Sequence, residues 1–152
     1  METRSSSIST SEPMDPIRAA YDDVYLYTFG RPGFILQHVV DAFAVQNADD
    51  ASTPMSVVFG LLGLYLHVEK QFTGRQVQRV HVELARRKRN WPAVFWPDTR
   101  GSMTVADVLA APAGPERDKA IDAWCLSVWT AFNGNRQRIV SLLRESIGLF
   151  DS

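Results

Sequence analysis

The chain has 152 residues, of which 45% are hydrophobic and 11% aromatic, so it is long enough for one folded domain with its own core. Its formal net charge is -1, from 16 basic and 17 acidic side chains, and this balance argues against a general nucleic-acid-binding or membrane-surface protein. The single cysteine, Cys125, excludes an intramolecular disulfide and a Cys-x-x-Cys site, and it is typical of a reducing cytoplasm.

The start of the chain is polar and rich in serine and threonine, without the apolar core of a secretory signal. We expect residues 1–13 to be a disordered tail and residues 14–150 to form a single helical domain. The longest nearly apolar run, residues 55–66, is well short of the ~20 residues that a membrane-spanning helix needs. We therefore expect a cytoplasmic protein with no membrane segment.

The first helix is predicted over residues 15–28. Asp15 is a good N-cap, and Pro16 suits the first helical position. The Phe-Gly-Arg-Pro-Gly run at residues 29–33 then ends the helix, because glycine and proline both oppose its continuation.

The second helix is predicted over residues 34–46 and carries the first histidine. His38 lies at the edge of its apolar stripe rather than on its polar side. Asp41 follows three positions later on the same face, close enough to meet the imidazole.

The third helix, residues 54–72, is apolar nearly all the way round, which is typical of a helix that is buried on most sides. His67 falls within this apolar part. Gly60 and Gly63 each cost about 1 kcal/mol relative to alanine in a helix interior, so we expect them to allow a neighbouring helix to approach closely.

The fourth helix is predicted to begin at Thr73, which has Gln76 at the spacing of a capping box. His81 occupies a position in this helix where an apolar side chain is expected. The basic run at residues 86–89 lies where cations oppose the negative end of the helix dipole.

The remaining chain begins with a connection rich in proline and tryptophan, residues 90–103. Its large aromatic residues are expected to dock on the bundle: Trp91, Phe95 and Trp96. A short helix starts at Thr104, and a long C-terminal helix is predicted over residues 116–143, kinked or split by the Asn-Gly-Asn run at 133–135. With no repeat and no alternating strand pattern, we predict an all-α, single-domain bundle of four to five helices with a long C-terminal helix.

The histidines lie on three separate predicted helices, each on or beside an apolar face: His38, His67 and His81. Neutral imidazole binds zinc or iron well, and three protein ligands leave a position open for water or substrate. Asp41 and Glu69 could supply a fourth ligand or hold an imidazole tautomer. No two histidines have the spacing of compact helical metal motifs. Our main hypothesis is a chain that binds one divalent transition metal, zinc or iron, and acts as a metal-dependent enzyme.

A packing explanation for the same histidines stays open, in which each ring lies in the interior and bonds to a carboxylate, tyrosine or carbonyl. The protein would then be a noncatalytic interaction module for a small molecule or a protein, using the aromatic connection and the Arg75 and Arg79 face. Contact of residues 86–89 with nucleic acid is a third alternative, which the balanced charge disfavours. A homo-oligomer also stays open.

The chain resembles an uncharacterised bacterial family, the domain of unknown function 5946 family, in four tracts: HVVDAFAVQ, GLYLHVEKQFTGRQVQRVHVELARR, TVADVLAAP and ERDKAIDAWCLSVW. The resemblance covers about residues 18–130 and places His38 in the most recognisable family motif. It implies a soluble bacterial helical protein and no particular reaction. Some relatives carry a Cys-x-x-Cys pair ahead of the first helix, which this chain lacks.

Overall fold

The computed structural model describes residues 15–87 and 90–150, and within these ranges the chain forms seven α-helices, two short 3₁₀ helices and no strand. The α-helices are α2 (Pro16–Thr28), α3 (Leu36–Gln46), α4 (Pro54–Lys70), α5 (Gly74–Arg87), α6 (Val105–Ala110), α7 (Pro115–Ala131) and α8 (Arg136–Ile147). The all-α class is confirmed, but the described residues already hold more helices than the four to five predicted. The predicted tail, residues 1–13, and the end of the basic run at 88–89 lie outside the described residues.

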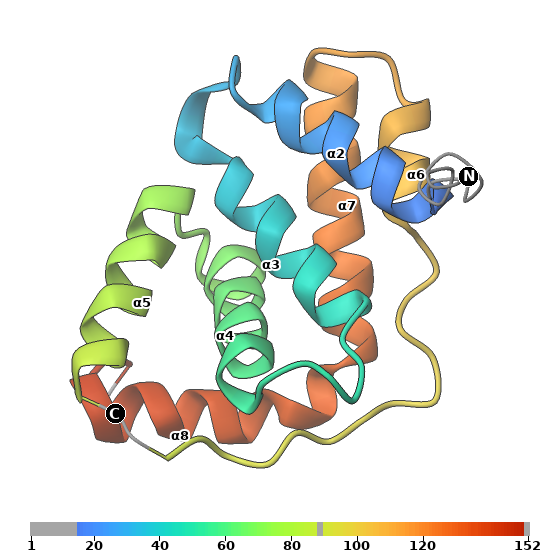
Figure 1. Cartoon of the computed structure of the whole chain (residues 1–152). Helices are drawn as coiled ribbons and strands as arrows, with labels where there is room; N and C mark the ends of the chain where they lie inside the picture. The colour runs from blue at the N-terminus through green and yellow to red at the C-terminus, as the bar shows by residue number, and fades with distance from the viewer. Residues whose placement is uncertain (1–14, 88–89, 151–152) are drawn as a thin grey trace, which may run out of the picture.

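Helix α4 lies at the centre of the fold, in contact with α3, α5, α7 and α8 (Figure 1). Its buried residues follow one another with little interruption: Val57, Val58, Gly60, Leu61, Leu62, Gly63, Leu64, Tyr65 and Leu66. This confirms the prediction of a helix buried on most sides. Helices α2 and α6 pack together at the other end of the molecule, against α3 and α7.

The helix starts follow the capping residues that the sequence suggested. The Asp15 carboxylate accepts a hydrogen bond from Ile17 N at 3.0 Å, so α2 begins where predicted. At the start of α5, Thr73 Oγ1 accepts from Gln76 N at 3.2 Å and Gln76 Oε1 accepts from Thr73 N at 2.8 Å. These reciprocal bonds confirm the predicted capping box.

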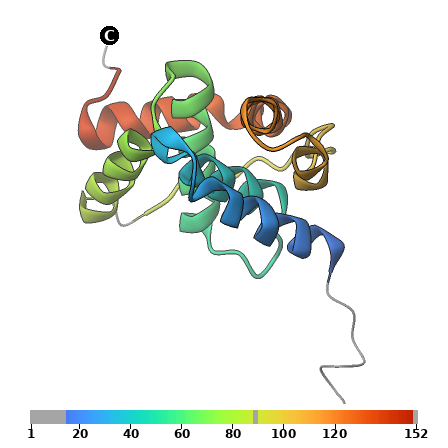
Figure 2. The same cartoon turned by 90° about the horizontal axis from the view of Figure 1, so that it is seen from above.

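The C-terminal segment is not one long helix, because it is divided at the Asn-Gly-Asn run where the sequence predicted a kink or a split. Helix α7 has 17 residues and ends at Ala131, a 3₁₀ turn (η2, Asn133–Asn135) follows, and α8 has 12 residues. Figure 2 shows α7 end-on while α8 lies lengthwise. The buried Asn135 explains the break, because its side chain accepts from Phe95 N at 2.7 Å and donates to Phe95 O at 2.8 Å.

The connection from Asn90 to α6 is therefore fixed to the bundle at several points. Trp91 meets the ring of Phe59 edge-on at 5.3 Å, and Trp96 meets Phe132 in the same way at 6.2 Å. The predicted docking is confirmed for Trp91, whereas Phe95 and Trp96 touch the bundle but keep 55% and 44% of their surfaces exposed. Among the described helices, none combines the length and the apolar character that crossing a membrane requires.

Candidate functional site

Two of the three predicted ligands meet where α3 packs along α4. The imidazole rings of His38 and His67 are stacked, with centroids 3.6 Å apart and planes 15° from parallel. His38 is 3% exposed and the His67 side chain 17% exposed. The site is thus a pair of imidazoles, one in the core and one near the surface.

Asp122 of α7 orients the outer ring. Its Oδ1 lies 3.0 Å from His67 Nε2. A carboxylate oxygen can only accept a hydrogen bond, so Nε2 carries the hydrogen, and in the neutral ring the lone pair is on Nδ1. A pocket of about 280 Å³ opens beside this contact and is lined by His67, Val68, Gln71, Asp122 and Leu126. Solvent therefore reaches one edge of the pair.

The inner ring is held neutral by its surroundings. Burial, with a smaller contribution from the neighbouring His67, lowers the pKa of His38 to about 3, while Asp122 acts in the opposite direction. Removing a charge from water is costly, so the ring gives up its proton instead. At neutral pH His38 consequently offers an unprotonated nitrogen.

Asp41 lies one turn beyond His38 on α3 and faces Gly63 of α4. Its Oδ1 accepts from Gln37 Nε2 at 3.0 Å, and a Cβ built on Gly63 would lie only 1.9 Å from its Oδ2. Complete burial raises the pKa of Asp41 well above its usual range, while the bond from Gln37 lowers it. No hydrogen bond joins Asp41 to either imidazole among the described contacts, so the predicted role of holding a tautomer falls to Asp122 instead.

Three buried side-chain atoms of the described residues have no hydrogen-bond partner: His38 Nδ1, His67 Nδ1 and Asp41 Oδ2. All three belong to residues that the sequence marked as possible metal ligands. A buried polar group without a partner costs about 1–3 kcal/mol of stability. The cost is concentrated at this one contact between α3 and α4.

The third histidine lies elsewhere. His81 Nε2 donates to the carbonyl oxygen of Phe59 at 2.9 Å, and its ring stacks on the Phe59 ring at 4.7 Å. Phe59 is two turns before His67 on α4, roughly 12 Å along the helix axis. Burial lowers the pKa of His81, and the Phe59 carbonyl acts against it. This ring is a satisfied packing residue.

Glu69 also has another role. It lies two positions after His67, so its side chain leaves α4 from nearly the opposite face. Trp129 Nε1 donates to Glu69 Oε2 at 2.8 Å, and Arg136 Nε donates to Oε1 at 2.9 Å. Glu69 thereby joins α4 to α7 and α8 instead of serving the histidines.

The donors do not yet converge. Within the described part of the chain, no three His, Cys, Asp or Glu side chains form a group able to hold a metal ion. An imidazole nitrogen binds a metal ion in the plane of its ring, and the two stacked, nearly parallel ring planes lie about 3.6 Å apart and so do not meet at one ion. One ring of the His38–His67 pair has to turn before both can bind one ion.

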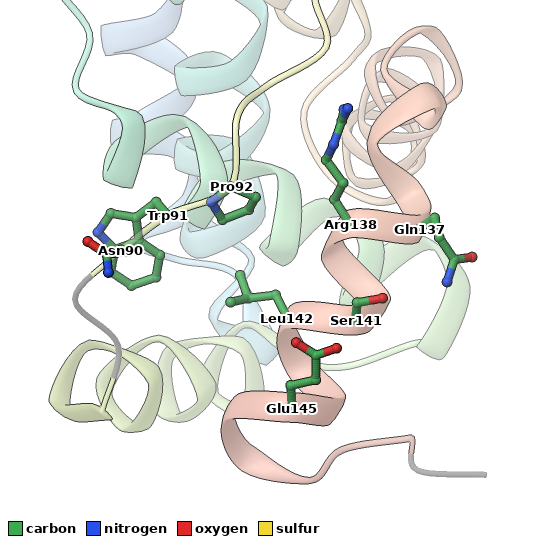
Figure 3. A pocket seen from close by; sticks show the side chains of 8 residues that line it. All are labelled: Asn90, Trp91, Pro92, Gln137, Arg138, Ser141, Leu142 and Glu145. Carbon is green, nitrogen blue, oxygen red and sulfur yellow. The ribbon is translucent and has the colours of Figure 1, made fainter.

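A larger pocket, of about 450 Å³, lies between the connection and α8. Trp91 and Pro92 form one side, and Leu142 extends from α8 toward Trp91 (Figure 3). Polar side chains complete the lining: Asn90, Gln137, Arg138, Ser141 and Glu145. An apolar wall with a few polar groups is the usual composition of a small-molecule site.

Asp122 is the site residue that sequence reasoning missed. It is separated from His67 by 55 residues. The available signal was its place on the helix that carries the buried Trp124 and Cys125, but no spacing rule links that helix to α4. Contacts between distant helices depend on how they pack, which periodicity does not specify.

Comparison with known proteins gave no match among curated proteins and none among solved structures. A family model described as a family of unknown function, DUF5946, matches residues 18–133, and this agrees with the resemblance of the four sequence tracts. The match includes α3, α4, α5 and α7, and hence His38, His67 and Asp122. The chain belongs to this family of unknown function, DUF5946.

Proposed function

We propose that the protein binds one divalent transition metal ion, zinc or iron, at the His38–His67 pair, with Asp41 as the carboxylate donor. The observation that supports this is the concentration of three unpartnered buried atoms on these three residues. A bound ion would give each of these atoms the partner that it lacks. Compared with the three-histidine hypothesis, Asp41 takes the place of His81.

The protonation states favour donor chemistry at the imidazoles. Asp122 holds the hydrogen of His67 on Nε2, which is the arrangement by which a carboxylate orients a metal-ligating histidine. Burial keeps His38 neutral. Asp41, whose pKa is raised, would have to lose its proton on binding, so we expect metal affinity to rise with pH.

The proposal includes metal-dependent catalysis, without a particular reaction or substrate. Three protein donors leave coordination positions for water or substrate, and a bound ion lowers the pKa of its water. The pocket of about 280 Å³ beside His67 and Asp122 would give a substrate access. We place the protein in the cytoplasm, because a single cysteine is typical of a reducing compartment.

Metal analysis of protein purified without a histidine tag tests the proposal. We expect about one zinc or iron per chain, and we expect His38→Gln and His67→Gln each to remove most of it. His81→Gln is the control, since His81 is a half-buried histidine bonded to Phe59 that lies away from the pair. When the chelated protein is titrated with Co²⁺, visible absorption should develop in the wild type and in His81→Gln. It should not develop in His38→Gln or His67→Gln.

Less than about 0.2 metal per chain, with no Co²⁺ spectrum, would exclude the site. Equal loss of metal in His81→Gln would also contradict it. Circular dichroism of each variant separates loss of ligands from loss of the fold.

A second candidate function is supported by the pocket beside Trp91, which is about 450 Å³ and suits a noncatalytic small-molecule module (Figure 3). In this case chelator leaves the melting temperature unchanged. Ser141→Trp fills the pocket from α8 and abolishes binding of hits from a fluorinated fragment set in ¹⁹F NMR. If Ser141→Trp binds the same fragments as the wild type, the pocket is not the binding site.

A further inference from the structure

We propose that a separate pocket, at the turn between α2 and α3, binds a small anion with an apolar body, of the aromatic carboxylate class, through Arg75. This Arg75 pocket has a volume of about 350 Å³, within the range of small-molecule sites. It is lined by residues of α2, of the turn and of the starts of α3 and α5: Thr28, Phe29, Arg31, Pro32, Gly33, Phe34, Leu36 and Arg75.

The charge of the lining is positive. Its two ionisable side chains are arginines, and no acidic residue lines the pocket. Arg31 is already paired, since its Nη2 lies 2.6 Å from Asp118 Oδ2 and its Nε lies 3.1 Å from the same oxygen. Arg75 makes no ion pair with any carboxylate of the described residues, and its guanidinium lies 5.0 Å from the centre of the Phe34 ring. One cation is therefore free to meet an anion.

The lining is also held in place before any ligand arrives. Gly33 and Phe34 both have left-handed backbone angles, φ 80° and 52°. For Phe34 this conformation costs about 1–2 kcal/mol, and it persists only where surrounding contacts impose it. The contact that does so is with α5, because a Cβ on Gly74 would lie 1.8 Å from Phe34 O. Pre-positioned groups bind with a smaller loss of conformational entropy.

The walls of the pocket indicate the body of the ligand. Phe34 lies beside the Arg75 guanidinium, Leu36 adds apolar surface to the lining, and Phe29 keeps 64% of its surface exposed. A guanidinium binds a carboxylate through paired hydrogen bonds, and an aromatic wall suits a flat apolar ring. Inorganic phosphate would satisfy the charge but leave the apolar walls unused. An aromatic carboxylate matches both parts.

Benzoate is the probe, and benzamide is its neutral counterpart of almost the same shape. The full chain, labelled with ¹⁵N, is titrated with each while amide shifts are followed by NMR. We expect benzoate to shift the amides of Gly33, Phe34, Gly74 and Arg75, and to bind at least about tenfold more tightly than benzamide or phosphate. Binding here is independent of any metal, so the measurement is made on chelated protein.

Arg75→Ala should weaken benzoate binding by about tenfold. Arg79→Ala is the matched control, because it removes the same charge one turn further along α5, at a residue that does not line the pocket. We expect a much smaller effect than that of Arg75→Ala, since a charge that makes no direct hydrogen bond to the ligand acts on it only weakly through water. Circular dichroism confirms that both variants are folded.

Any of four results would overturn the assignment. Benzoate and benzamide could bind equally, the shifts could fall outside the turn and the start of α5, or no saturation could occur up to ~10 mM benzoate. Equal weakening by Arg75→Ala and Arg79→Ala would likewise show a general charge effect and not a site.

Discussion

The carboxyl group of Asp41 occupies the space that a side chain at Gly63 would fill. A Cβ on Gly63 would lie 1.9 Å from Asp41 Oδ2 and 2.6 Å from its Cγ. The close approach of α3 and α4 at this point therefore depends on a glycine opposite a buried acid. The next turn of each helix brings His38 against His67. The geometry of the imidazole pair thus depends on the Asp41–Gly63 contact beside it.

Gly63→Ala should destabilise the protein by at least ~3 kcal/mol, because the added methyl group would overlap a buried carboxyl in a packed core. Urea denaturation measures the change in the free energy of unfolding. Asp41→Ala in the same chain should recover about 2 kcal/mol of this loss, because it removes the overlapping atoms. Strictly additive effects of the two substitutions would show that they do not meet.

The buried His38 should make the protein sensitive to acid. Its folded pKa of about 3 lies below the ordinary value of 6.5, so between these values the unfolded state binds the proton and the native state does not. Stability from this group is complete above pH 6.5 and falls as the pH drops toward 3. Between pH 7 and 5 the loss is about 2 kcal/mol.

Urea denaturation of the wild type and of His38→Gln at pH 7 and pH 5 measures this contribution. We expect the wild type to lose more stability than the variant over this interval. Parallel changes in the two proteins would mean that His38 is protonated as readily in the native state as in the unfolded chain.

Asp41 should have the opposite pH dependence. Its folded pKa is raised above the unfolded value, so the unfolded state loses its proton first as the pH rises. The native state then binds more protons than the unfolded state, and stability falls with increasing pH. Asp41→Asn removes the ionisation, so the variant should gain stability relative to the wild type from pH 5 to pH 8, as measured by thermal unfolding. A constant difference would indicate that Asp41 titrates normally.

Glu69→Gln should destabilise the protein by ~1–2 kcal/mol, because it weakens the charged bonds to Trp129 and Arg136 that join three helices. The Arg136 partner is half exposed, which limits the effect. Glu83→Gln is the control. Within residues 15–87 and 90–150, Glu83 pairs with exposed arginines of its own helix, and we expect a change of about 0.5 kcal/mol or less.

The same variant also separates the two roles predicted for Glu69. If Glu69 only joins α4 to α7 and α8, Glu69→Gln leaves the metal content of the protein unchanged. A loss of metal without a loss of stability would instead indicate that Glu69 is a metal ligand.

Much of the fold was predictable because it depends on local rules. Asp15, Thr73 and Gln76 cap helices through bonds to residues two or three positions away, and the apolar run of α4 indicated its burial directly. The break between α7 and α8 was harder, because the bonds that fix it join Asn135 to Phe95, 40 residues earlier. Local sequence suggested a kink or a split there but did not decide between the two.

The candidate site was predictable only in part, for a similar reason. Apolar periodicity placed His38 and His67 toward the interior, but it did not tell which buried faces meet. His81 satisfied the same criterion and instead lies against Phe59, two turns from His67 along α4. Asp122 lies on an exposed side of α7, where periodicity gives no reason to select it.

Cys125 lies fully buried on α7, with its sulfur 3.7 Å from the carbonyl oxygen of His38 on α3. Burial also raises the pKa of the thiol well above its usual range. In the native packing the sulfur is therefore both inaccessible and protonated, and a thiol reagent does not react with it. Modification therefore has to wait until α3 and α7 separate. Since this is the sole cysteine, the rate of labelling by such a reagent reports how often the helices around the imidazole pair come apart, without any introduced probe.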